Sequence, residues 1–116
     1  MTRDELTPEF PLRIVESRAF TRRRDELFED EEYRALQIAL LLNPRLGPVV
    51  PGTGGVRKLR WSVPGRGKRG GVRVIYYHAA SQRVLALLHV YTKNESEDLT
   101  SDQKAALRKL VEAEYG

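Results

Sequence analysis

The side chains with the clearest capacity for chemistry in this chain are cations in a long stretch that no carboxylate interrupts. Between positions 33 and 94 the sequence contains eleven Lys and Arg residues and no Asp or Glu. The flanking segments are acidic, with ten acids against six bases over residues 1–32 and six against three over residues 95–116. Surfaces kept only for solubility usually intersperse both signs. The basic stretch therefore favours a polyanion as partner, and a nucleic acid before any other.

Several of these cations alternate with apolar residues at the period of a β-strand. Lys58 and Arg60 alternate with Leu59 and Trp61, and Arg73 lies opposite its apolar neighbours, where we expect it to be a surface residue. Lys93 has the strand parity of Leu87, His89 and Tyr91, so these are expected on one face. We expect an antiparallel sheet to gather four cations on one phosphate-binding surface: Lys58, Arg60, Arg73 and Lys93.

A glycine-rich basic segment lies between two predicted strands, Gly65-Arg-Gly-Lys-Arg-Gly70. Its spacing matches a dinucleotide-binding fingerprint, but that motif needs a helix after it and an acidic residue about twenty positions on. Here a strand follows, and no carboxylate occurs before Glu95. The segment is predicted to be a flexible hairpin tip, which either contacts a phosphate backbone or serves only as a connection.

Other classes of site find little support in the composition. The chain has no cysteine, which excludes disulfides, zinc–thiolate sites and thiol nucleophiles. Two histidines eleven positions apart in an acid-free region offer no convincing metal site, so we expect neither a metal nor another cofactor. No apolar run approaches the length of a membrane span, and the charged start lacks the apolar core of a secretory signal. A cytoplasmic protein without membrane contact is expected.

The elements that must position the cations are predicted from hydrophobic periodicity and turn residues. In order they are a strand over 10–16, two helices between 17 and 43, a loop over 44–55, strands over 56–63, 71–78 and 83–93 with a turn over 79–82, and a final helix. Asp30 is the expected N-cap between the two helices, and Pro44 ends the second by Asn43. Thr100 and Gln103 form a capping-box pattern that opens the last helix. The order β-α-α-β-β-β-α predicts an α+β fold with a mainly antiparallel sheet, in a single domain over residues 1–116.

Two packing expectations follow from the same periodicities. Trp61 is expected on the core side of its strand. In the last helix the spacing of Leu107, Leu110 and Val111 predicts one apolar stripe facing the sheet.

Three segments together resemble a known family. They are Gly52-Thr-Gly-Gly-Val-Arg-Lys-Leu-Arg-Trp61, Gly70-Gly-Val-Arg-Val-Ile-Tyr-Tyr77, and Leu88-His-Val-Tyr-Thr-Lys-Asn-Glu95 followed by Asp98-Leu99. They are similar to the RelE/HigB toxins of bacterial type II toxin–antitoxin systems, over residues 10 to 112 and most specifically over 52–99. The resemblance implies a RelE-like microbial RNase fold with a twisted sheet, and cleavage of mRNA in the ribosomal A site.

By position, the resemblance assigns the catalytic roles to Lys58, Arg60, Arg73 and Lys93. The residues expected to contact RNA are Arg57, Arg66, Lys68, Arg69 and Tyr91. Metal-independent cleavage uses the RNA 2′-hydroxyl as nucleophile, so the enzyme must orient the phosphate, assist proton transfer and stabilise the extra charge. The tyrosine that the family commonly places near the last helix is replaced by Leu99, which leaves the general base and acid unassigned.

The resemblance also implies partners. These are the ribosome with its mRNA and a cognate antitoxin, expected to be a helix-turn-helix, HigA-like protein through which the complex reaches operator DNA. Two alternatives stay open from the sequence. One is a ParE-like toxin that inhibits DNA gyrase, and the other is a nucleic-acid-binding module without catalysis.

Overall fold

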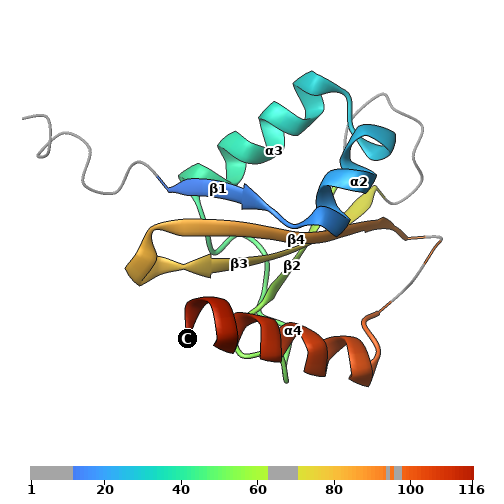
Figure 1. Ribbon diagram of the computed structural model, residues 1–116. Helices are drawn as coiled ribbons and strands as arrows, with labels where there is room; N and C mark the ends of the chain where they lie inside the picture. The colour runs from blue at the N-terminus through green and yellow to red at the C-terminus, as the bar shows by residue number, and fades with distance from the viewer. Residues whose placement is uncertain (1–11, 63–70, 94, 96–97) are drawn as a thin grey trace, which may run out of the picture.

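A four-stranded sheet lies between two helices on one face and a third helix on the other (Figure 1). The computed structural model describes residues 12–62, 71–93, 95 and 98–116. The strands are β1 (Arg13–Glu16), β2 (Arg57–Trp61), β3 (Val72–Ala79) and β4 (Val84–Thr92), in the spatial order β1-β4-β3-β2. The helices are α2 (Arg18–Leu27), α3 (Asp30–Leu42) and α4 (Ser101–Tyr115), and a short 3-10 turn, η1 (Ala80–Gln82), joins β3 to β4. The predicted α+β fold and element order are confirmed, with β1 parallel to β4 and the other pairs antiparallel.

The helix ends follow from capping side chains. The Phe20 backbone N–H donates to the Ser17 hydroxyl at 3.0 Å and so begins α2. The N-cap of α3 is Glu29, whose side chain forms a capping box with Glu32, so the prediction of Asp30 as the cap is wrong by one residue. The reason is reciprocal bonding: the Glu29 backbone N–H donates to Glu32 at 2.8 Å, a contact that requires Glu32 at the third helical position.

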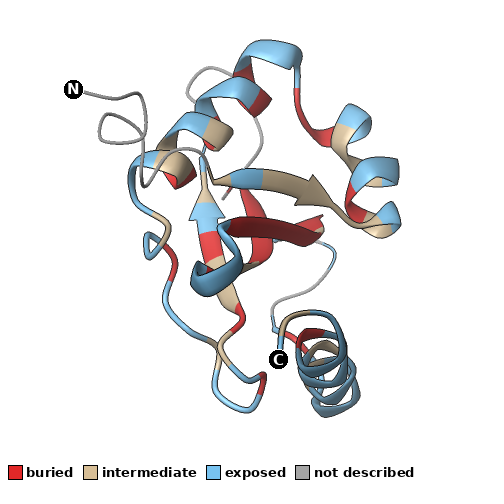
Figure 2. Ribbon diagram, turned by 60° about the vertical axis from the view of Figure 1, so that its left-hand side comes forward, coloured by how far each residue is buried: buried red, intermediate tan, exposed pale blue. Residues whose placement is uncertain are grey.

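Two apolar clusters fill the spaces above and below the sheet (Figure 2). The cluster on the α2 and α3 side includes Phe20, Leu36 and alternate residues of β3, and Trp61 packs against it as predicted. The cluster on the α4 side includes Ile75, Leu99 and Val111. The predicted stripe of α4 is only partly correct, because Leu110 is 40% exposed.

A β-bulge in β4 changes which residues face each layer. Ile75 pairs with His89, whereas its neighbour Tyr76 pairs with Leu87, so Leu88 is the extra residue. As a result Leu87 packs on the α2 and α3 side, while Tyr91 packs on the α4 side. The expectation that Leu87 shares a face with Tyr91 is therefore wrong, since strict alternation fails at a bulge.

The loop between α3 and β2 is fastened to the sheet by the fully buried Tyr76. The Tyr76 hydroxyl donates to Pro44 O at 2.8 Å and accepts the Gly47 backbone N–H at 2.9 Å. The Lys58 backbone N–H donates to Pro48 O at 3.0 Å, which places the loop against the outer edge of β2. A Cβ atom at Gly47 would lie 2.9 Å from the Lys58 carbonyl oxygen, so glycine permits this close approach.

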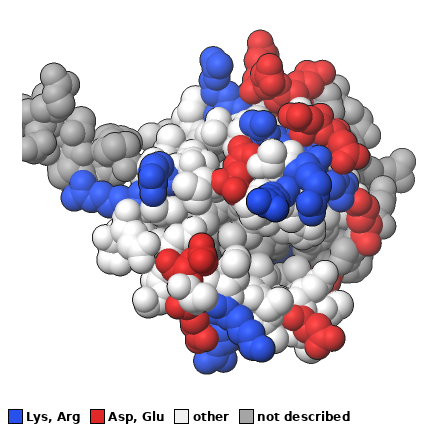
Figure 3. Space-filling model, viewed as in Figure 1, with Lys and Arg blue, Asp and Glu red and all other residues white. Residues whose placement is uncertain are grey.

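The charged side chains are unevenly distributed. Figure 3 shows acidic side chains gathered over the end of α2 and the start of α3, with the arginines of α2 beside them. Across the part of the chain that the structure describes, no helix is long and apolar enough to cross a membrane. Among the same residues, no three His, Asp or Glu side chains are grouped so as to hold a metal ion.

Candidate nucleic-acid interface

Three neighbouring strands place one residue each in a single row across the sheet. Arg60 of β2 is the register partner of Arg73 in β3, which in turn is the partner of Tyr91 in β4. Register partners have Cβ atoms roughly 5 Å apart and point to the same face. Lys58 lies two positions from Arg60 on β2 and therefore also faces α4. The structure thus brings together three of the four cations expected from the sequence, with Tyr91 beside them.

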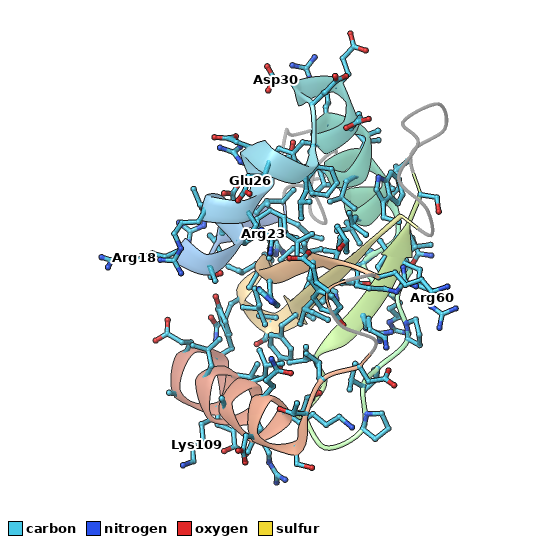
Figure 4. The ribbon with its side chains drawn as sticks, turned by 90° about the vertical axis from the view of Figure 1, so that its right-hand side faces the viewer. Arg18, Arg23, Glu26, Asp30, Arg60 and Lys109 are labelled. Atoms are coloured by element: carbon cyan, nitrogen blue, oxygen red, sulfur yellow. The ribbon has the colours of Figure 1, made fainter. Side chains whose placement is uncertain are left out.

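The members of this row differ in their access to solvent. Arg60 is exposed, and in Figure 4 its side chain extends outward beyond β2, the edge strand of the sheet. Arg73 is only 7% exposed. The expectation that Arg73 is a surface residue is wrong, because the sheet face opposite Val72 and Val74 is covered by the second apolar cluster. The row therefore runs from an exposed guanidinium to a buried one.

Tyr91 ends the row as a buried phenol. Tyr91 is 3% exposed, and its hydroxyl oxygen has no hydrogen-bond partner among the residues that the structure describes. Burial raises the pKa of Tyr91, with the nearby Arg73 opposing and Asp98 reinforcing the change. The hydroxyl consequently stays protonated at neutral pH and can donate to an anion that reaches it.

Asp98 is a member of this group that the sequence analysis missed. Its Oδ1 accepts a hydrogen bond from the Lys58 ammonium at 3.0 Å, across forty positions of chain. This bond is the main reason why the pKa of Asp98 is lowered, and Lys104 and Arg60 add smaller effects. Local spacing carries no signal for the contact, because it depends on how the segment after β4 turns back over the sheet.

Leu99 follows Asp98 and is the residue that stands where the resemblance led us to expect a tyrosine. Its side chain is buried in the apolar cluster under α4, which also contains Ile75 and Val111. An apolar side chain in this place stabilises the packing of α4 but brings no group for proton transfer.

Lys93 lies just beyond the end of β4, where it is exposed. The neighbouring Glu95 secures this end of the strand: its Oε1 accepts from the Thr92 backbone N–H at 2.8 Å, the Thr92 hydroxyl at 3.0 Å and Arg23 Nη2 at 2.9 Å. These bonds lower the pKa of Glu95 to about 2, with Arg23 as the largest cause. The same end of β4 contains His89, whose pKa is lowered mainly by burial and secondarily by Arg23.

Of the other residues expected to contact RNA, the structure describes only Arg57, and its side chain is turned away from this group. Arg57 has the strand parity of Leu59, and its Nη1 donates to Gly47 O at 2.7 Å and to Arg45 O at 3.4 Å. Its guanidinium is thus used to hold the loop before β2. Three further residues of the prediction lie outside the described residues: Arg66, Lys68 and Arg69.

The fold is similar to a solved toxin structure. The match is to the Escherichia coli toxin RelE, studied as a double arginine-to-alanine mutant in the free state. It covers 84% of this chain and 96% of that chain, with a TM-score of 0.59 and 16% sequence identity. At that identity the similarity establishes the fold alone.

The sequence itself carries the family assignment. A family model described as the RelE toxin of the RelE/RelB toxin–antitoxin system matches residues 46–115, which is more than half of the chain. The matched range includes all three strands that contribute to the row of Arg60, Arg73 and Tyr91, together with α4. The chain therefore belongs to the RelE family of toxins from type II toxin–antitoxin systems.

Proposed function

We propose that this RelE-family toxin is a ribosome-dependent mRNA endonuclease that cleaves without a metal ion. The observation that carries the proposal is the register of Arg60, Arg73 and Tyr91 in one row, with Lys58 on the same face. Guanidinium groups bind phosphate oxygens in a bidentate way and keep their charge at every physiological pH. A row of this kind suits a phosphodiester that gains negative charge during reaction.

The reaction has a simple balance. The RNA 2′-oxygen forms a bond to phosphorus, the bond from phosphorus to O5′ breaks, and the products are a 2′,3′-cyclic phosphate and a 5′-hydroxyl. One proton leaves the 2′-hydroxyl and one is supplied to O5′. Lys58 and Lys93 are the candidates for these proton transfers: a neutral lysine amine would accept the proton of the 2′-hydroxyl, and a lysine ammonium would supply the proton to O5′. The exposed Arg60 binds the incoming phosphate. The buried Arg73 and the Tyr91 hydroxyl then stabilise the negative charge of the phosphorane.

Membership in a toxin–antitoxin family implies a cognate antitoxin. We infer that this antitoxin is a helix-turn-helix, HigA-like protein and that the operator is bound only by the complex. Co-expression with the neighbouring reading frame tests this. The expected result is co-purification of both proteins with no toxicity, whereas a non-toxic toxin recovered alone would contradict it.

The endonuclease activity is tested by adding the purified chain to ribosomes programmed with a defined mRNA. We expect cuts inside the A-site codon, with ends that carry a cyclic phosphate, and no cuts when ribosomes are left out. Arg73→Met is the inactive comparison, because it keeps an apolar side chain in the buried position and removes the charge. Intact mRNA on competent ribosomes would contradict the proposal, and inhibition of DNA supercoiling by gyrase would point to the ParE-like alternative.

A further inference from the structure

A cleft adjoins the row of cations, between the loop before β2 and the start of α4. Its volume is about 260 Å³, close to the lower limit for small-molecule sites in proteins. One wall is apolar and is formed by Pro48, Val49, Val50 and Pro51. The other wall contains Lys58, Asp98, Leu99 and Lys104. Lys58 is the strand residue that lines the cleft, and it also belongs to the candidate interface, so the two sites adjoin at Lys58.

The apolar wall has two unusual properties for a surface loop. Val49 is 47% exposed, although its backbone forms an antiparallel β-bridge with Arg57. The wall is also held in shape, because Thr53 is fully buried and its hydroxyl donates to Val50 O at 2.7 Å while accepting the Val56 N–H at 3.0 Å. Flanking prolines restrict the backbone further. A fixed, exposed apolar surface beside cations is typical of a binding site.

The polar wall offers two ammonium groups from different elements. Lys58 comes from β2 and Lys104 from the first turn of α4, and both line the same cleft. A phosphate between them would receive charge-assisted hydrogen bonds from two sides. An apolar wall opposite that phosphate matches the chemistry of a nucleotide, which has a flat base on one side of its sugar and a phosphate on the other.

We propose that this cleft is a subsite for one nucleotide of single-stranded RNA beside the scissile phosphate, with Lys58 and Lys104 on its phosphate and the Pro48–Pro51 wall against its base. The position relative to the scissile phosphate rests on the proposed endonuclease function. The binding itself does not, because it depends only on the lysines and the apolar wall.

Asp98 occupies the phosphate position in the free protein. Its carboxylate accepts from Lys58 as a phosphate oxygen would, and its side chain is 79% exposed, so a phosphodiester can approach the pair from solvent. Exposed ion pairs contribute little to stability, and an incoming phosphodiester can replace the carboxylate on Lys58. RNA binding at this subsite is therefore an exchange of one anion for another on the same ammonium group.

The test compares two lysines of α4 in equilibrium binding of a short fluorescent single-stranded RNA, measured by anisotropy without ribosomes. Lys104→Ala is expected to weaken binding by about tenfold, as for the loss of one charge-assisted hydrogen bond. It should also reduce the slope of log affinity against log salt by about 0.7, the value for one phosphate contact on a single strand. Lys109→Ala removes the same charge from an exposed position of α4 outside the cleft and should change neither quantity (Figure 4).

A second pair of variants tests the apolar wall. Val49→Ser should weaken RNA binding without changing the salt slope, while Ile38→Ser, at a similarly exposed position on α3, should leave binding unchanged. If Lys104→Ala matches Lys109→Ala, or Val49→Ser matches Ile38→Ser, the subsite is wrong, whatever the ribosome assay shows. Binding that depends on Lys104 and Val49 without any cleavage on ribosomes would support the subsite and contradict the endonuclease.

Discussion

The ammonium of Lys58 is bonded to the carboxylate of Asp98 at 3.0 Å, which places an anion from the segment before α4 on the cationic face of the sheet. This carboxylate competes with any phosphate for the same cation. The consequences for binding, catalysis and stability are open to direct measurement.

Replacing Asp98 by Asn should strengthen RNA binding. The change removes the internal competitor for Lys58 and one negative charge near the phosphate, so we expect an affinity gain of roughly two- to fivefold at low salt. Glu112→Gln is the matched control, because Glu112 is also an exposed, ion-paired carboxylate, bonded to Arg108 at 3.2 Å on α4. Equal or weaker binding by the Asp98 variant in anisotropy would show that Asp98 does not occupy the phosphate position.

Replacing Tyr91 by Phe should separate stability from activity. Within the described part of the chain the buried hydroxyl has no partner, and an unsatisfied buried polar group costs about 1–3 kcal/mol, so its removal should leave stability unchanged or increase it. Cleavage on ribosomes should nevertheless fall by at least about tenfold if the hydroxyl donates to the reacting phosphate. Urea denaturation and a single-turnover cleavage assay measure the two effects, and full activity in the variant would remove Tyr91 from the site.

Arg73 is the residue whose charge should matter most for the reaction. Loss of one preorganised donor typically lowers kcat by roughly 10²–10³. Arg73→Ala also removes a buried aliphatic stem, so we expect this variant to lose about 1–3 kcal/mol of stability. We expect it to lose its toxicity as well. Arg73→Met keeps most of that packing, and a folded Arg73→Met protein that remains toxic would place the reaction elsewhere.

Glu95 should make the fold sensitive to acid. Its pKa is about 2 in the folded protein against an ordinary value of 4.5, because Arg23 and Thr92 bond to the charged carboxylate. A group with a depressed pKa stabilises the fold above its unfolded pKa, and this contribution is lost as the pH falls through the folded pKa. Urea midpoints between about pH 5 and 2 should therefore fall more steeply for the wild type than for Glu95→Gln, and parallel curves would refute the role of Glu95.

Thr53 should control the shape of the cleft wall. Thr53→Val keeps the volume but leaves the Val56 N–H without its acceptor, at a cost of about 1–3 kcal/mol. RNA binding should weaken as the loop loses its geometry, whereas Thr53→Ser keeps the hydroxyl and should retain most of both properties. Urea denaturation measures the stability and anisotropy measures the RNA affinity of the same samples. Unchanged RNA binding by a destabilised Thr53→Val would show that the loop does not take part in RNA recognition.

Local sequence signals determined most of the framework. Alternation of apolar side chains indicated β2, β3 and β4, Pro44 ended α3, and the Thr100–Gln103 capping box opened α4, because each depends on residues within a few positions. The same alternation placed Lys58, Arg60 and Arg73 on one side of their strands. These features depend on neighbouring residues and need no contact with distant parts of the chain.

Tertiary structure decided the rest, since it depends on residues far apart in the chain. The bulge at Leu88 places Leu87 on the face opposite Tyr91, and it is defined only by the pairing of β4 with β3. Leu99 is buried in the apolar cluster under α4 and Arg73 is 7% exposed, although nothing beside them in the sequence distinguishes a covered face from an open one. The contact of Lys58 with Asp98 arises only where the segment after β4 folds back, so the anion on the cationic face has no local signature and only the folded chain reveals it.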